Sequence, residues 1–180
     1  TTAPDNVAHN MICDPLVRNN AVEGNTTETV PGSAESWDVS EDGMTYPFHI
    51  RENAKWSDGV ALTANDFEYT LKLMADPAAA STNGWLFDGV IVNFGEALYS
   101  NGKTPDDIAV KAIDDKTLEI TAVKNMPYFV ELMKLPCFYP VREDMGEKYG
   151  KEYASSPDKV VCNGPFILTE WEHESKLVFE

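Results

Sequence analysis

The chain has 180 residues, and its 43% hydrophobic and 11% aromatic content is enough for a packed core and excludes a disordered chain. Thirty acidic residues against fourteen basic ones give a formal net charge of −16, which disfavours binding to nucleic-acid phosphates and anionic lipid surfaces. No apolar run approaches the roughly 20 residues that a membrane span needs.

The N-terminal third begins with weak patterns. A short helix is predicted before Pro15, and the polar segment 19–31 has turn signals at Asn19-Asn20 and Glu23-Gly24 that indicate a loop or a hairpin tip. The three cysteines, Cys13, Cys137 and Cys162, lack metal-type or redox-type spacing. One disulfide in any of three pairings, or three buried free thiols, both fit the sequence.

Residues 37–50 form the clearest pattern. Asp42-Gly43 separates two alternating apolar runs, which predicts a tight hairpin because glycine adopts positive φ without penalty. Pro47 cannot donate to a ladder, so its nitrogen is expected to face solvent or a bulge. The residues expected to point inward are Trp37 and Val39 before the turn, and Tyr46, Phe48 and Ile50 after it.

A turn at 57–59 (Ser-Asp-Gly) leads into an amphipathic helix. Thr63 is the predicted N-cap, with the Asp66 carboxylate three residues later, and Asp76-Pro77 is the predicted stop. The inward-facing positions at helical spacing are Phe67, Thr70, Leu71 and Met74. Residues 78–102 are irregular but aromatic, which predicts a packed loop with short helices.

The rest of the chain predicts a second hairpin and several short elements. Segments 108–113 and 117–123 flank a turn, and Leu118, Ile120 and Ala122 alternate with polar residues, so one face is expected to be buried. A helix is predicted from Pro127, with Tyr128, Phe129, Leu132 and Met133 facing in. The remaining predicted elements are a strand at 138–141, a helix at 143–153 with a break at Gly150, and a strand pair at 162–171 and 176–180.

The sequence contains no motif for catalysis, a metal or a nucleotide. Paired carboxylates fall in turns, where Asp is favoured for backbone capping. His49 and His173 are expected at the surface, and zinc, calcium, nucleophilic-serine and phosphate-loop spacings are all missing. We therefore predict a protein that is not an enzyme and holds neither a metal nor a cofactor. Trp37, Trp56 and Trp171 fit core or sheet positions, whereas Trp85 lies on an open loop that could contact a ligand.

The ordered motifs resemble the family 5 extracellular solute-binding proteins, the oligopeptide- and dipeptide-binding proteins of ABC importers. The motifs are PGSAESW at 31–37, FHIR at 48–51, KWSDG at 55–59, LTANDFEY at 62–69, VKAIDDKTL at 110–118, PYF at 127–129, NGPF at 163–166 and EW at 170–171. The resemblance implies a mixed α/β (α+β) fragment of a type II periplasmic-binding-protein-like fold, with antiparallel or mixed sheets and peripheral helices. It also implies that residues 1–12 and 144–180 belong to a partial first lobe, that 13–143 form an extra subdomain, and that the second lobe lies outside this chain.

The resemblance implies an extracytoplasmic protein, periplasmic or lipid-anchored at the cell surface, that works as a monomer with the permease subunits of an ABC importer. Its expected ligand is a short peptide, held as an extended strand. The implied ligand-binding residues are Thr1, Thr2, Ala3, His9, Asn83 and Trp85, although Asn83 stands where peptide-binding relatives have Tyr. Alternatives are a non-peptide solute (a nickel complex, haem or an oligosaccharide), a secreted carboxylate-dependent hydrolase, and a pure interaction module.

Overall fold

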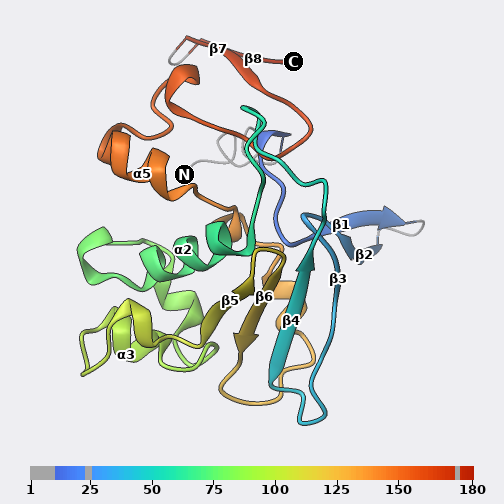
Figure 1. Cartoon of the computed structure of the whole chain (residues 1–180), viewed down its shortest axis with the longest axis vertical. Coiled ribbons are helices and arrows are strands. Elements are labelled where there is room, and N and C mark those ends of the chain that lie inside the picture. Colours follow the sequence, from blue (N-terminus) through green and yellow to red (C-terminus); the bar gives the residue numbers. More distant parts are fainter. Residues whose placement is uncertain (1–10, 23–25, 173–174) are drawn as a thin grey trace.

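The computed structural model describes residues 11–22, 26–172 and 175–180. It is a mixed α/β fold built from antiparallel sheets with short helices at the periphery, as the sequence predicts (Figure 1). A four-stranded sheet lies in the lower half of the view, and the C-terminal hairpin lies at the opposite end of the long axis. Across the described residues, every helix is too short or too polar to cross a bilayer.

The central sheet unites the two predicted hairpins in the order β3-β4-β6-β5, with antiparallel pairing throughout. Its strands are β3 (Ala34–Trp37), β4 (Thr45–Ile50), β5 (Val110–Asp114) and β6 (Thr117–Thr121). The turn at Gly43 (φ +71°) is closed by its N–H donating to the Ser40 carbonyl at 2.8 Å. The predicted inward faces are confirmed, since Tyr46, Phe48, Ile50, Leu118, Ile120 and Ala122 are all buried.

The start of the first hairpin departs from the prediction. Val39 is 52% exposed because β3 ends at Trp37, so the alternation does not extend to it, and Trp37 itself is half-buried. Pro47 lies in the inner strand β4, and its carbonyl accepts from Asp38 N–H at 2.9 Å. In an antiparallel strand the nitrogen and the carbonyl of one residue point to the same side, so the Pro47 nitrogen, which carries no hydrogen, also faces β3, just beyond the end of that strand.

Helix α2 (Ala64–Ala75) packs against β5 and β6, and its buried face includes all four predicted positions. Thr63 and Asp66 form a capping box, in which Thr63 N–H donates to Asp66 Oδ2 at 2.8 Å. The following segment contains 3₁₀ turns at Pro77–Ala79 and Gly84–Phe87 and the short helix α3 (Phe94–Leu98), which confirms the packed loop.

Two predictions after β6 are wrong. Helix α4 (Phe129–Leu132) buries Phe129 as expected, but Tyr128 precedes the helix and is 55% exposed. The predicted strand at 138–141 does not form, because Pro136–Phe138 is a 3₁₀ turn and Pro140 lacks an N–H for a ladder. The Val141 N–H donates instead to Thr70 Oγ1 at 2.8 Å.

The chain ends form the rest of the molecule. Helix α5 (Glu143–Tyr149) stops at Gly150 as predicted and is followed by a 3₁₀ turn, and β7 (Leu168–Glu172) pairs with β8 (Lys176–Phe179). Strands β1 (Val17–Val22) and β2 (Thr26–Pro31) make an antiparallel pair that projects from the rest of the molecule (Figure 1). A small buried cluster of Ile12, Cys162 and Leu168 is separate from the main core.

Candidate functional site

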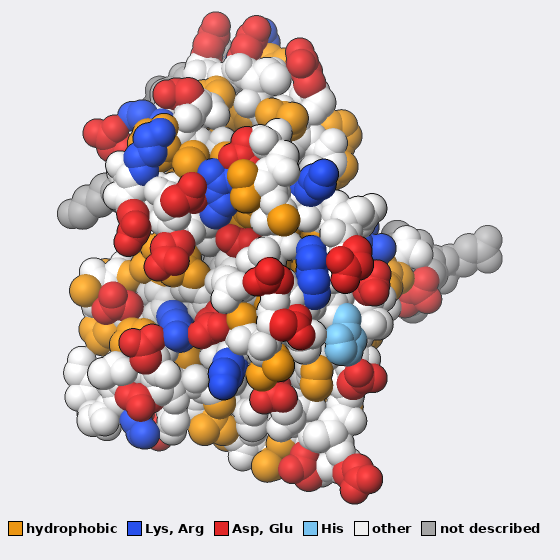
Figure 2. Space-filling model, in the orientation of Figure 1, with side chains coloured by type: hydrophobic (Ala, Val, Ile, Leu, Met, Phe, Trp, Pro, Cys, Tyr) orange, Lys and Arg blue, Asp and Glu red, His pale blue; other side chains and the backbone are white. Residues whose placement is uncertain are grey.

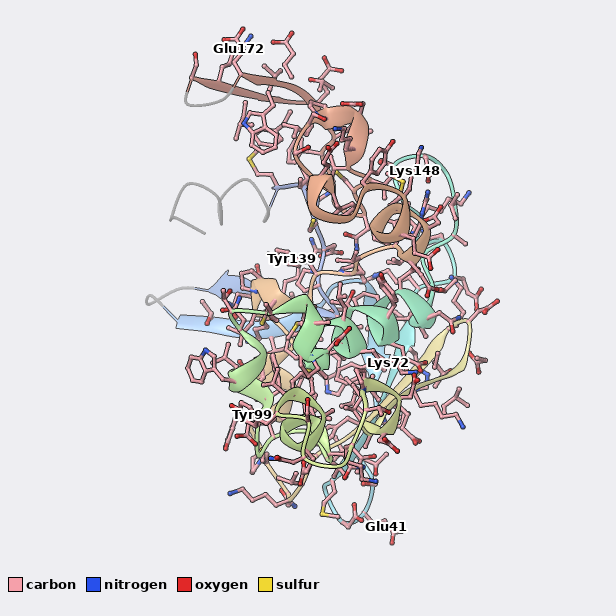
Figure 3. All side chains as sticks on the ribbon, turned by 90° about the vertical axis from the view of Figure 1, so that its left-hand side faces the viewer. Glu41, Lys72, Tyr99, Tyr139, Lys148 and Glu172 are labelled. Atoms are coloured by element: carbon pink, nitrogen blue, oxygen red, sulfur yellow. The ribbon has the colours of Figure 1, made fainter. Side chains whose placement is uncertain are left out.

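An apolar cavity of about 580 Å³ lies between α2 and the β7–β8 hairpin. The labelled Tyr139 lies between these two parts of the molecule in Figure 3. Segments far apart in the chain, from residue 12 to residue 179, converge on the cavity, and only the tertiary fold brings them together. The lining residues are Ile12, Cys13, Thr70, Leu73, Met74, Ser81, Asn83, Pro136, Cys137, Tyr139, Pro140, Val141, Tyr153, Ala154, Val160, Val161, Leu168, Trp171, Leu177 and Phe179.

One wall of the cavity is fixed to α2 through Thr70. Its hydroxyl donates to the Asp66 carbonyl at 2.9 Å and accepts from the Val141 N–H at 2.8 Å. A buried threonine on an apolar helix face therefore satisfies a donor of the irregular segment 139–141. This explains why that segment lines a cavity without belonging to a sheet.

The loop after α2 places the predicted ligand-binding residues in different surroundings. Asn83 lines the cavity, whereas Trp85 is not among the lining residues and is 63% exposed. Gly84 lies between them, and a Cβ there would approach the Met74 carbonyl oxygen to 2.9 Å, so the loop backbone is packed against the end of α2. The other four predicted residues, Thr1, Thr2, Ala3 and His9, lie outside the described residues.

The four tryptophans and His49 lie in the kinds of position that the sequence predicts. Trp56 is 2% exposed and Trp171 is half-buried and lines the cavity, so Trp85 is by far the most exposed of the four tryptophans. His49 is at the surface, where its Nε2 lies 2.9 Å from Asp38 Oδ2. His173 lies outside the described residues.

The 57–59 turn fastens the C-terminal part of the chain beside the cavity. Ser57 N–H donates to the Cys162 carbonyl at 2.7 Å, and Cys162 N–H donates back to Ser57 Oγ at 3.1 Å. Asp58 pairs with Arg142 at 2.5 Å, and the hydrogen bond from Arg142 helps to hold the pKa of the Asp58 carboxyl below its usual range. The most distinctive turn of the sequence is therefore a structural joint and does not itself line the cavity.

The cavity lining is poorly solvated, and this changes the acidity of its side chains. Burial raises the pKa of the Cys13 thiol to about 12, with smaller contributions from Cys162 and Asp14. Burial likewise raises the pKa of Cys137 to about 11 and that of Tyr139 to about 12. All three cysteines are free thiols. Sequence patterns gave no sign that Cys13 and Cys137 share a cavity, because they are separated by more than a hundred residues.

Carboxylates gather in a second, shallower groove lined by Glu68, Asp76, Asp106 and Glu143 together with Lys72. Glu68 accepts from the Ala112 N–H at 2.6 Å and pairs with Lys72 at 2.9 Å, and Lys72 also pairs with Asp106 at 2.8 Å. These contacts hold α2 on the sheet edge, which is a structural role.

Acidic side chains elsewhere are spread over the whole visible face (Figure 2), and the described residues contain no group of three or more His, Cys, Asp or Glu placed to hold a metal.

A family model covers most of the chain. The model for bacterial extracellular solute-binding proteins, family 5 (middle), matches residues 28–180. The chain belongs to this family. The family 5 resemblance carried by the motifs is thus confirmed, and it is a family of solute-binding proteins.

Individual family 5 relatives agree in sequence and in structure. The dipeptide-binding protein DppE of Bacillus subtilis is 42% identical over 96% of this chain. The murein tripeptide binding protein MppA of Escherichia coli superimposes on 99% of the chain with a TM-score of 0.91 and 33% identity, and Listeria monocytogenes OppA bound to peptide on 91% with 0.81 and 33%. The chain spans about a third of each relative: 32% of DppE, 34% of MppA and 31% of OppA.

Proposed function

We propose that this chain is the N-terminal part of the substrate-binding component of an ABC importer that captures short peptides. The observation that carries the proposal is the likeness over nearly the whole chain to relatives named as dipeptide- and tripeptide-binding proteins and to an OppA bound to peptide. An uncharged cavity beside Asn83, a position implied to contact ligand, supports it. In this proposal the protein catalyses no reaction. It is a monomer located outside the cytoplasm, where it delivers its solute to the permease subunits.

The proposal also divides the chain into a subdomain and part of a lobe. Residues 13–143 form the extra subdomain, and 1–12 with 144–180 belong to the first lobe; the separate small cluster of Ile12, Cys162 and Leu168 supports this division. A second lobe then closes over the ligand by hinge motion. The ligand-lining residues from this chain are Thr1, Thr2, Ala3, His9, Asn83 and Trp85, with main-chain hydrogen bonds to an extended peptide.

The test is calorimetry of the full-length protein with di-, tri- and tetrapeptides. Micromolar or tighter binding, about −8 kcal/mol or better, is the expected result. Non-peptide solutes of the classes named above form the comparison set, and binding of one of these with no heat from any peptide would overturn the peptide assignment. The isolated 180-residue chain is the matched control, and we expect it to bind no peptide tightly because it lacks the closing lobe.

A further inference from the structure

We propose that the cavity between α2 and the β7–β8 hairpin receives one uncharged, apolar side chain of the bound peptide and rejects lysine, arginine, aspartate and glutamate there. This inference rests on the proposed function and adds a side-chain preference to it. The cavity includes Asn83 at its lining, so a peptide lying along that loop could direct one side chain inward. Its volume of about 580 Å³ is within the range of small-molecule sites and admits a side chain as large as an aromatic one.

The absence of charge from the lining is the first argument. Charged residues make up 24% of the chain, yet none of the described residues that line this cavity is charged. The polar groups that do line it are neutral: the hydroxyls of Thr70, Ser81 and two tyrosines, two thiols, one indole and the Asn83 amide. A lysine or carboxylate entering the cavity would lose its hydration without meeting an opposite charge.

Two charged residues that adjoin the lining in sequence, Asp14 and Arg142, are already paired with other charges. Asp14, next to Cys13, lies 3.4 Å from Arg18, and Arg142, next to Val141, contacts both Asp58 and Asp144 at 2.5 and 2.7 Å. A charged ligand group could gain either of these two as a partner only by breaking an existing ion pair, which adds to its desolvation cost. The raised pKa values of Cys13 and Cys137 independently report that these surroundings disfavour a charge.

The experiment measures the peptide preference of the full-length protein. Tetrapeptides of alanine carry a single Phe, Leu, Lys or Glu at each position in turn, and affinities are measured by calorimetry. We expect one position at which Phe or Leu binds at least about tenfold tighter than Lys or Glu. Leu73→Glu, which places a carboxylate on the α2 wall at a position 37% exposed, should reduce that preference at least about tenfold and improve binding of the Lys peptide.

Two further variants make the result specific. Leu177→Glu introduces the same charge from β8 and gives an independent measurement if Leu73→Glu does not fold. Ile113→Glu is the control, since Ile113 is similarly exposed on β5 and does not line the cavity. Peptides that bind equally well whatever their side chains, or a preference that Leu73→Glu and Leu177→Glu leave intact, would overturn the inference alone. No binding of any peptide would overturn the proposed function as well.

Discussion

The side-chain amide of Asn163 pairs with the main chain of Asp14 as a strand neighbour would. Its Oδ1 accepts from the Asp14 N–H at 3.0 Å, and its Nδ2 donates to the Asp14 carbonyl at 2.8 Å and to Ser33 Oγ at 3.1 Å. The same segment lies against two glycines: a Cβ on Gly32 would come within 2.4 Å of the Pro15 carbonyl oxygen, and one on Gly164 within 2.6 Å of Ile12. These contacts tie the start of the described chain to its returning C-terminal part.

Replacing Asn163 by Ala should therefore lower the free energy of unfolding by about 2 kcal/mol, because a partly buried N–H and carbonyl lose their partner. Urea denaturation gives the measurement. Asn125→Ala is the matched control, since the Asn125 amide makes a single exposed bond of 3.3 Å to the Asp42 carbonyl and should cost less than about 0.5 kcal/mol. Equal losses of unfolding free energy in the two variants would mean that the Asn163 pairing stabilises the fold no more than an exposed hydrogen bond does.

Lys116 joins separate parts of the chain through one ammonium group. Its Nζ donates to the carbonyls of Arg51 at 3.1 Å, Leu62 at 3.2 Å and Glu52 at 3.4 Å. We expect Lys116→Met to destabilise the chain by about 2 kcal/mol, since hydrogen bonds to a charged group are stronger than neutral ones. Lys111→Met on the neighbouring strand β5, at an exposed position, is the control for loss of one positive charge. A thermal or urea scan that ranks the two variants together would contradict the prediction.

Stability should fall at alkaline pH because of the cavity residues. Burial raises the pKa of Cys13 from 9.0 to about 12, of Cys137 from 9.0 to about 11 and of Tyr139 from 10.0 to about 12. The unfolded chain releases these protons first, so the stabilisation is complete below about pH 9 and is lost as pH rises toward about 12. Urea midpoints between pH 8 and 11 test this, and Cys13→Ala with Cys137→Ala should make the decline shallower. A urea midpoint that stays constant up to pH 11 would contradict the prediction, because it would mean that these thiols and the Tyr139 hydroxyl have the same pKa in the folded and unfolded chain.

The exposure of Trp85 makes a fluorescence prediction. Single-tryptophan variants that retain only Trp85 should be quenched strongly by iodide in the 180-residue chain, whereas those that retain only Trp56 should be nearly unaffected, because these residues are 63% and 2% exposed. In the full-length protein with bound peptide, Trp85 should become shielded if it contacts the solute as proposed. Quenching that is unchanged by peptide would contradict the proposed contact of Trp85 with the ligand, but it would not test that of Asn83.

The sequence alone determined the local elements where strong signals coincide. The Asp42-Gly43 turn, the capped helix from Thr63 and the alternation through Leu118 and Ile120 each specify their structure within a few residues, because glycine conformation, capping and side-chain period act locally. The ordered motifs also specified the family. The end of β3 and the absence of a strand at 138–141 were not predictable in this way, since strand pairing depends on a partner elsewhere in the chain.

Only the tertiary structure decided where the candidate site lies. The cavity depends on contacts between residues far apart in sequence, such as Thr70 with Val141 in its wall and Ser57 with Cys162 beside it, and no local pattern reports them. The same holds for Asn83 and Trp85, which are two residues apart but have different surroundings because Gly84 packs against the end of α2. Neighbours in sequence share composition, whereas desolvation and the exclusion of charge arise from packing in three dimensions.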